Sequence, residues 1–498
     1  MKGGKTRLTV LPHGVFAFIW HFLSKRKWLF WAQVVLIFLR GASNMAWPYS
    51  IKMLADAFGR ATPETVWESV RAVLFLYFSI YAAHILVNRV YKLIGNYFYP
   101  AMSTAVRSEV VSGIQSKSFS FFINNFTGSM VNKIGDLTRE SRELTKLSLW
   151  ILEIWAFVFA GFAMFAPIHW GITAVCCAWI FAHISFCLFR LRTWNKLAYD
   201  TSEAASAVTG RIADSLSNYG SVKSFAREKA ERRYIMPFLM DRQRKDTKWG
   251  RTINRDYLLL DFLSFFGLYV PVFAMIIALY RNGTVGVGSI LFVTTAVDWI
   301  NGRIYDLGDK LSAFSESYGT MKQAMWVVTA PLEIEDAKGA AELKVKDAVI
   351  EFDRVRFRYD SRRDVLFDGF GLKIGSGEKV GLVGSSGAGK SSIIHLLLRY
   401  FDVQGGAILI DGQDIRGVTQ ESLRRAIAFI PQDTSLFHRT IRDNIAYGRQ
   451  DAAQAEVESA ARKAYAHELI MGTPDGYSSL VGDRGIKLSV GQRQRIAI

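Results

Sequence analysis

Residues 379–400 read KVGLVGSSGAGKSSIIHLLLRY, which is an apolar run, a glycine-rich turn and a helical run in succession. The turn, Gly384–Ser391, fits the pattern G-x-x-x-x-G-K-[ST]. Glycines let backbone N–H groups turn inward around a phosphate without Cβ clashes, and the start of the following helix adds positive potential. A strand at Lys379–Val383 and a helix at Ser391–Tyr400 would be the right flanks, so the sequence predicts a nucleoside triphosphate site.

Two side chains of this turn have separate expected roles. Lys390 can reach the β- and γ-phosphates, where its charge also stabilises the transition state, and the Ser391 hydroxyl can ligate Mg²⁺. The nucleotide-binding residues predicted here are Gly384, Ser385, Ser386, Gly387, Ala388, Gly389, Lys390, Ser391 and Ser392.

The surrounding chain has the pattern of a soluble α/β domain. From residue 348 to residue 498 no segment is apolar enough to span a membrane, and strand-like runs alternate with helical ones. The charged stretch 329–347 before it is predicted to be a linker. The strand-like runs are AVIEF (348–352), KVGLV (379–383), AILI (407–410) and IAFI (427–430).

The composition of the whole chain differs from that of an ordinary soluble protein. The 498 residues are 50% hydrophobic and 13% aromatic, which is too apolar for a disordered chain and unusual for a wholly soluble one. Cys176, Cys177 and Cys187 lie in one apolar run without a histidine at zinc-finger spacing, which excludes a disulfide framework and favours packing. The net charge of +17 fits either a nucleic-acid partner or a membrane protein with basic cytoplasmic loops.

Six apolar segments decide between these alternatives, because each approaches the roughly 20 residues that cross a bilayer. Buried helices of a large soluble core are disfavoured by so many runs of this length. The sixth segment is the weakest, since Asp298 interrupts it. The predicted spans are residues 28–51, 70–89, 147–168, 170–189, 257–280 and 285–305, within an all-α membrane domain of residues 28–328.

The links between the spans alternate in length and charge, which orients the bundle. Those after the first, third and fifth spans are short, whereas the stretch from Arg190 to Arg255 holds 15 Lys or Arg against seven acidic residues. Positive residues near span ends stay in the cytoplasm. The long links and both termini are therefore expected there, with the spans continuing as helical stalks. Residues 1–27 are predicted to form a helix in the cytoplasmic interface.

A second motif identifies a family. Leu488-Ser489-Val490-Gly491-Gln492, followed by RQRIAI, resembles the signature motif of ABC transporters. Its position after a P-loop and six predicted spans resembles an ABC half-transporter of the exporter type, over nearly the whole chain. The resemblance implies ATP and Mg²⁺ as cofactors, a second half-transporter as partner in a homodimer or heterodimer, and export driven by ATP hydrolysis.

The resemblance also assigns roles to single residues. Tyr359 looks like the aromatic residue that stacks on adenine, with an ordinary core position as the alternative. Gln432 is similar to the glutamine that positions Mg²⁺ and the attacking water. The signature would meet the ATP of the other subunit, with Leu488 anchoring the turn and Ser489 joining the N–H groups of a helix start.

Three further segments resemble family elements that connect the two domains or precede the signature. Residues 116–138 and 209–229 look like the intracellular loops that carry coupling helices. Val481–Gly485 resembles the loop just before the signature of exporters.

Two departures from the family pattern bear on activity. Val490 stands where the family usually has Gly, at a close approach of backbone to phosphate, so weaker closure is expected. Family members continue past the signature with an apolar strand ending in Asp-Glu and then a switch His, and none of these precedes Ile498. We therefore expect the sequence to be incomplete, with residues 1–498 inserting in the membrane but lacking ATPase activity until about 80–100 further residues are restored.

Alternatives to an exporter stay open in the sequence. A nucleotide-binding but hydrolysis-poor subunit of a heterodimer is favoured by Val490, and an ATP-gated channel is a third possibility, whereas the signature disfavours a membrane-anchored P-loop kinase. The substrate could be a drug or other small molecule, a lipid, a peptide or a metal conjugate. A multi-pass protein of a bacterial inner or plasma membrane, surrounded by lipid and without a nucleic-acid partner, is expected.

Polar residues at membrane depth are costly and often functional. They are candidates for a translocation path, with pairing between helices as the alternative. These candidates are Arg40, Asn44, His84, Asn88, Arg89, Glu153, His183, Asp261 and Asp298.

Overall fold

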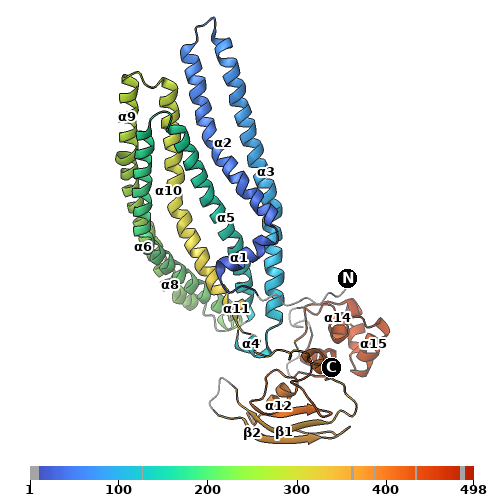
Figure 1. Cartoon of the computed structure of the whole chain (residues 1–498). Coiled ribbons are helices and arrows are strands. Elements are labelled where there is room, and N and C mark those ends of the chain that lie inside the picture. The colour runs from blue at the N-terminus through green and yellow to red at the C-terminus, as the bar shows by residue number, and fades with distance from the viewer. Residues whose placement is uncertain are drawn as a thin grey trace. The chain divides into compact units, whose positions relative to one another are not determined.

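The chain divides into two compact units, which are described separately (Figure 1). The first consists of Met1–Lys117 and Phe121–Leu332, and the second of Ser118–Ser120 and Glu333–Ile498. The computed structural model describes residues 11–125, 127–331, 333–359, 364–385, 387–431, 435–482 and 488–498.

The first unit is a bundle of long helices that lie side by side (Figure 1). Its long helices are α2 (Lys27–Arg60), α3 (Val66–Gln115), α5 (Thr127–Phe165), α6 (Trp170–Ser217), α8 (Glu228–Ser264) and α10 (Val287–Ala324). A π-helical turn (Phe265–Tyr269) joins α8 to α9 (Val270–Arg281). The short helices are α1 (Val15–Ser24), α7 (Tyr219–Ser224), α11 (Trp326–Thr329) and α4 (Phe119–Asn124), whose first two residues belong to the second unit.

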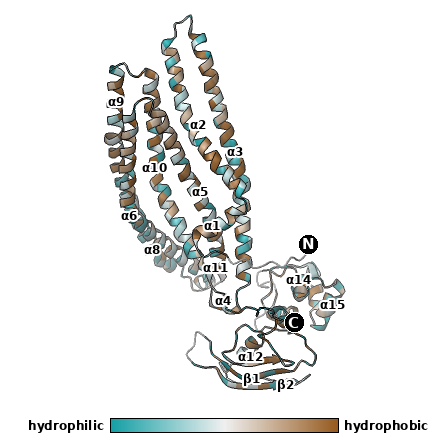
Figure 2. Ribbon diagram, in the orientation of Figure 1, coloured by the Kyte–Doolittle hydropathy of each residue, from teal (hydrophilic) through white to brown (hydrophobic). Residues whose placement is uncertain are grey.

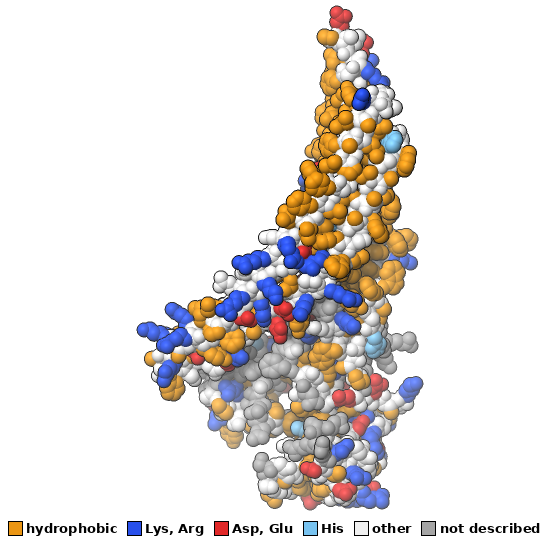
Figure 3. Space-filling model, turned by 90° about the vertical axis from the view of Figure 1, so that its left-hand side faces the viewer, with side chains coloured by type: hydrophobic (Ala, Val, Ile, Leu, Met, Phe, Trp, Pro, Cys, Tyr) orange, Lys and Arg blue, Asp and Glu red, His pale blue; other side chains and the backbone are white. Residues whose placement is uncertain are grey.

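The long helices exceed what a bilayer requires. α3 has 50 residues and α6 has 48, so at 1.5 Å per residue each extends for about 70–75 Å, against a hydrocarbon core of about 30 Å. Hydrophobic residues dominate one end of the bundle and hydrophilic residues become frequent toward the other (Figure 2). Lys and Arg side chains gather below the hydrophobic part (Figure 3). The predicted continuation of the spans as helical stalks is confirmed.

In the described residues, five helical segments are long and apolar enough to cross a membrane. Each of them overlaps one of the first five predicted spans. The sixth falls on α10, which has 38 residues but is not among these five segments. The reason lies in packing, since Phe292, Val293, Ala296 and Ile300 of this helix are completely buried among its neighbours. A helix covered by other helices needs fewer apolar side chains on its surface than one that faces lipid.

The short helix α1 packs against the bundle with one of its faces. Its buried face, including Phe18 and Phe22, joins a core cluster with residues of α3 and α10. Glu109 of α3 forms ion pairs with Lys25 and with His21, the latter at 3.0 Å. The opposite face leaves Trp20 half exposed, which gives α1 the two-sided character of an interfacial helix.

The second unit contains an antiparallel sheet and two groups of short helices. The sheet has the order β2-β1-β3-β4, built from β1 (Ile350–Phe357), β2 (Phe367–Ile374), β3 (Gly405–Ile410) and β4 (Gln413–Asp414). In register, Phe352 of β1 lies opposite Leu372 of β2 and Ile408 of β3. The helices are α12 (Lys390–Leu397), α13 (Gln420–Arg425), α14 (Ile441–Ile445), α15 (Gln454–Lys463), α16 (His467–Met471) and α17 (Val490–Ala497).

Two hydrophobic cores hold this unit together. One joins the inward face of the sheet to α12 through Phe352, Phe357 and Leu396. The other joins α14 to α17 through Ile441, Val457 and other buried residues that surround Leu488. The phosphate loop leads into the first core and the signature-like segment is attached to the second.

Two of the four predicted strands are not strands in the structure, so these two predictions are wrong. The runs 348–352 and 407–410 coincide with β1 and β3, whereas 379–383 and 427–430 carry no ladder among the described residues. Strand-like runs need a hydrogen-bonded neighbour to become strands. Here the apolar side chains of these runs are exposed, Val383 by 94% and Ile430 by 56%.

Candidate functional site

The glycine-rich turn folds as a tight loop that enters α12. Gly387 and Gly389 have φ angles of +89° and +90°, a left-handed backbone that favours glycine. Gly389 is the residue immediately before α12. A Cβ at Gly389 would also lie 2.9 Å from the Phe367 ring of β2, so this position is closed to larger residues on two grounds.

Lys390 is the first residue of α12 and its side chain folds back over the loop. Its Nζ donates to the backbone oxygens of Gly384, at 2.7 Å, and of Ser385, at 2.8 Å. The ammonium group is thus held at the loop, beside the N-terminus of a helix, where positive potential gathers. Ser391, the next residue, is exposed.

Tyr359 and Ser392 meet in the structure. Their hydroxyl groups are hydrogen-bonded at 2.9 Å, and Ser392 is buried. The Tyr359 ring is half buried and meets Phe357 and Phe401 edge-on, with centroids 4.8 and 5.1 Å away. The core therefore fixes the orientation of this ring next to the helix that follows the phosphate loop. Ser392 therefore helps to hold the Tyr359 ring in place. The position of Ser392 in the P-loop motif does not indicate this contact.

The signature-like segment forms a capped helix start. Ser489 precedes α17 and its Oγ accepts a hydrogen bond from the backbone N–H of Gln492 at 3.3 Å, while Gln492 Oε1 accepts from Ser489 N–H at 2.8 Å. This reciprocal cap follows the pattern S-x-x-Q, which is visible in the sequence and marks the residue where the helix begins. Leu488 is buried in the helical core, as expected of an anchor, whereas Val490 is 62% exposed.

Some predicted site residues lie outside the described part of the chain. These are Ser386 of the phosphate loop and Gln432. Of the segment Val481–Gly485, only the first two residues are described, with Val481 buried and Gly482 at a φ angle of +80°.

Ser118–Ser120, part of the first predicted intracellular loop, belongs to the second unit. Phe119 stacks on Tyr400 with ring centroids 4.0 Å apart and an interplanar angle of 23°. Ser118 donates a hydrogen bond of 2.7 Å to Glu333. Tyr400 follows α12 closely, so this loop segment contacts the region just beyond that helix.

Four of the polar candidates at membrane depth form one network. Arg40 of α2 donates from Nη1 to Glu153 of α5 at 2.8 Å and from Nε to Asn88 of α3 at 2.9 Å. The amide of Asn88 contacts His84, whose other partner is Ser43 at 3.2 Å. These contacts connect three helices, which favours helix pairing as the role of these four residues.

The other candidates lie apart from this network. Asp298 accepts a hydrogen bond of 2.8 Å from Tyr269, and Asp261 lies beside Tyr305. His183 is buried, and neither of its ring nitrogens has a partner in the described part of the chain. Within that same part, Asn44 and Arg89 form no bond with the network.

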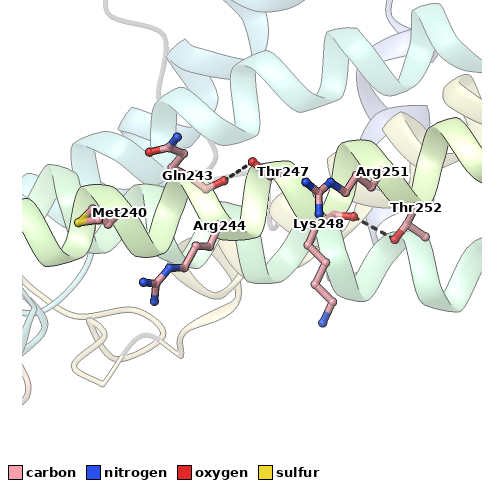
Figure 4. Close-up of a pocket in the computed structure, with 7 residues that line it drawn as sticks. All are labelled: Met240, Gln243, Arg244, Thr247, Lys248, Arg251 and Thr252. Atoms are coloured by element: carbon pink, nitrogen blue, oxygen red, sulfur yellow. Dashed lines mark hydrogen bonds between the residues drawn. The ribbon is translucent and has the colours of Figure 1, made fainter.

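A hollow of about 530 Å³ runs along α8, and no predicted nucleotide-binding residue lines it. Arg244, Lys248 and Arg251 recur along this stretch of one helix, and no ion pair joins them to other described residues (Figure 4). Unpaired cations on this stalk agree with the excess positive charge that keeps such links in the cytoplasm. The residues that line the hollow are Met240, Gln243, Arg244, Thr247, Lys248, Arg251 and Thr252.

Two known protein families match this chain, one over its apolar N-terminal part and one over its C-terminal α/β part. The profile of the ABC transporter transmembrane region matches residues 30–300, and that of the ABC transporter matches residues 367–498. The second match includes both the phosphate loop and the signature-like segment.

Similar proteins extend over almost the whole chain. An uncharacterized ABC transporter ATP-binding protein of Haemophilus influenzae is 32% identical over 98% of this chain and 81% of its own length. An ATM1-type heavy metal exporter of Novosphingobium aromaticivorans is 30% identical over 93% of this chain and 77% of its own. The solved structure of a bacterial Atm1-family ABC exporter with ATP bound superimposes with a TM-score of 0.78, at 27% identity, over 93% of this chain and 82% of the other.

These matches confirm the predicted fold class, a helical multi-pass membrane domain followed by an α/β P-loop domain, and the prediction that the chain binds ATP. They also confirm its function as an ATP hydrolase that drives export of an unidentified substrate. The chain belongs to the ABC transporter family, as an exporter-type half-transporter.

Proposed function

We propose that two half-transporters, this chain and a second copy or a close relative, bind ATP between the phosphate loop of one and the signature of the other. The observation that carries this proposal is the start of α17. Its first N–H groups have no acceptor within the helix, the Ser489–Gln492 cap holds them in place, and a Cβ added at Gly491 would meet nothing within 4 Å. An exposed helix start of this kind is suited to bind a phosphate that another subunit holds.

The phosphate loop would supply the other half of the site. Lys390 would neutralise the β- and γ-phosphates, Ser391 would ligate Mg²⁺, and Gln432 would complete the metal shell and orient the attacking water. The exposed hydroxyl of Ser391, one residue after the loop lysine, fits a metal ligand. Tyr359 would hold the adenine by stacking.

The heterodimer with a hydrolysis-competent partner is the second candidate, and Val490 favours it. An exposed Val at the first position of α17 places a branched side chain where the phosphate of the other subunit would approach.

The orientation with both termini in the cytoplasm, in a bacterial inner membrane, is supported by the unpaired cations along α8. Among the candidate substrates, metal conjugates are the first to test, since one relative is described as a heavy metal exporter.

Mixed dimers test the composite site. We expect Lys390→Ala and Gly491→Asp each to abolish retention of ATP in a homodimer, the first by removing a cation and the second by placing a carboxylate beside the γ-phosphate. The open space at Gly491 allows Asp to fold there. A mixed dimer of the two variants combines both lesions in one site and leaves the other intact. It should retain about half the ATP of the wild-type dimer after rapid desalting.

Gly491→Asn is the matched control for charge, because it has the size of Asp without the carboxylate, and it should retain more ATP than Gly491→Asp. If the mixed dimer retains no more ATP than its two parents, each site is contained in one subunit and the proposed arrangement is wrong.

Tyr359→Ala should weaken ATP binding by about 1 kcal/mol, because it removes the stacking surface and leaves the phosphate contacts intact. Tyr359→Phe keeps the ring and loses only the hydrogen bond to Ser392, so its affinity for ATP should stay near that of the parent. Affinities for ATP and for inorganic triphosphate, measured by calorimetry, separate the two contributions. An equal loss for both ligands after Tyr359→Ala would show that the residue supports the loop and does not contact the base.

A further inference from the structure

His183 of α6 is a polar side chain enclosed in an apolar seam of the membrane unit. Only 1% of it is exposed, and neither ring nitrogen has a hydrogen-bond partner in the described residues. The ring packs against Trp179 and Tyr305, with centroids 5.2 and 6.1 Å away. A neutral imidazole offers one donor and one acceptor, and a buried polar group that lacks both contacts is rare in native proteins. The acceptor nitrogen is available to a ligand.

Cys187 lies one helical turn after His183, on the same face of α6. It is 5% exposed, and its Sγ is 3.5 Å from the point where a Cβ on Gly308 would stand. Tyr305, which the His183 ring faces, is three residues before Gly308 on α10. Imidazole and thiol therefore lie against the same stretch of α10, at Tyr305 and Gly308.

We propose that His183 and Cys187 bind a soft monovalent cation of the Cu(I) and Ag(I) class. Two ligands four residues apart on a helix can hold one metal ion, as paired histidines do in helical zinc sites. Thiolate sulfur and imidazole nitrogen are the ligands that soft ions select. No group of three or more His, Cys, Asp or Glu side chains converges within the described residues. A two-ligand site suits ions that accept linear coordination and does not suit tetrahedral zinc.

Binding exchanges a proton for the cation. The Cys187 S–H bond breaks, the sulfur forms a bond to the metal ion and one proton is released, while the lone pair of His183 occupies the opposite position. No electron is transferred. Asp309 lies close enough to Cys187 to interact with its charge and also accepts a hydrogen bond from Tyr257. This carboxylate favours a cation at the site.

The other two cysteines are too distant to complete this site. Cys176 and Cys177 precede Cys187 by ten or more residues of the same helix, a separation of about 15 Å along its axis. Cys177 is exposed and could capture silver by itself. The test therefore uses the Cys176→Ser/Cys177→Ser variant, in which Cys187 is the one remaining thiol of a chain with three cysteines.

In that variant we expect one Ag(I) to bind per full-length chain in detergent, with one proton released, by titration calorimetry and by metal analysis after dialysis. His183→Phe should weaken silver binding by about 100-fold or more, since even second-shell changes cost 10–100-fold. Cys187→Ser should abolish it. His169→Asn is the matched control, because it changes another histidine, the N-cap of α6, at a position where Asn preserves the helix cap.

Silver should also raise the melting temperature of the Cys187-only protein and leave that of the His183→Phe variant unchanged, and His183→Gln replaces the latter if Phe prevents folding. The proposal is overturned if the Cys187-only protein binds no stoichiometric silver, or if His183→Phe and His183→Gln bind it as tightly as their parent. ATP affinity, measured on the same samples, should not change in any variant, so this outcome is independent of the nucleotide site.

Discussion

Lys390→Ala is expected to weaken ATP binding by about 30- to 1,000-fold, equivalent to about 2–4 kcal/mol. The Nζ of Lys390 is held at the phosphate loop by the backbone oxygens of Gly384 and Ser385. Without it, the negative charge of the β- and γ-phosphates has no compensating cation in the loop, and Ser391 loses a neighbour that defines its position. The dissociation constant of ATP for the purified protein, from calorimetry, measures the effect.

Lys379→Ala is the matched control for this prediction. Lys379 is an exposed lysine ahead of the loop, so its removal lowers the charge by the same amount without removing the contact. Its affinity for ATP should match that of the parent. Equal affinities for the Lys390→Ala variant and the parent would refute the assignment of the phosphate loop.

Glu153→Ala should destabilise the membrane unit by about 3–5 kcal/mol, because it leaves the Arg40 guanidinium buried without its counter-charge. Glu153 is 5% exposed and receives the 2.8 Å hydrogen bond from Arg40. The guanidinium also lies 4.4 Å from the centre of the Tyr91 ring, and the Arg40 side chain is only 17% exposed. A fall in the melting temperature of the protein in lipid nanodiscs measures the loss.

The double variant Arg40→Met/Glu153→Leu separates the cost of an unpaired charge from the value of the pair. We expect it to recover most of the stability, since apolar residues of similar volume often replace a buried ion pair without loss. Recovery is favoured here because Glu153 Oε1 is itself buried without a partner in the described residues. A double variant as unstable as Glu153→Ala would mean that α2 and α5 depend on the ion pair itself.

The features that could be predicted from the sequence are those encoded in a few neighbouring residues. The glycines of the phosphate loop reflect a left-handed backbone at Gly387 and Gly389, and this requirement is visible in the order of residues alone. The long helices follow from runs of apolar residues. Leu488 as an anchor could be inferred from the family, and its burial agrees with that role.

The features that could not be predicted depend on residues far apart in the chain. The runs 379–383 and 427–430 have the composition of strands, but a strand requires a neighbour, which composition does not reveal. Arg40 and Glu153 are separated by 113 residues and become partners only when α2 and α5 pack. The isolation of His183 likewise depends on α10, which the sequence left as the least certain span.

The burial of α10 has a consequence for the biogenesis of the protein. A helix centre that carries Asp298 costs about 2.5–3.5 kcal/mol for this residue when it inserts alone into a bilayer. In the bundle, Asp298 accepts a hydrogen bond from Tyr269, which lies just before α9. α9 and α10 are joined by a short turn, with α9 ending at Arg281 and α10 starting at Val287. We expect α10 to leave the translocon as a hairpin with α9, since its own apolarity is a weaker signal for entering the membrane.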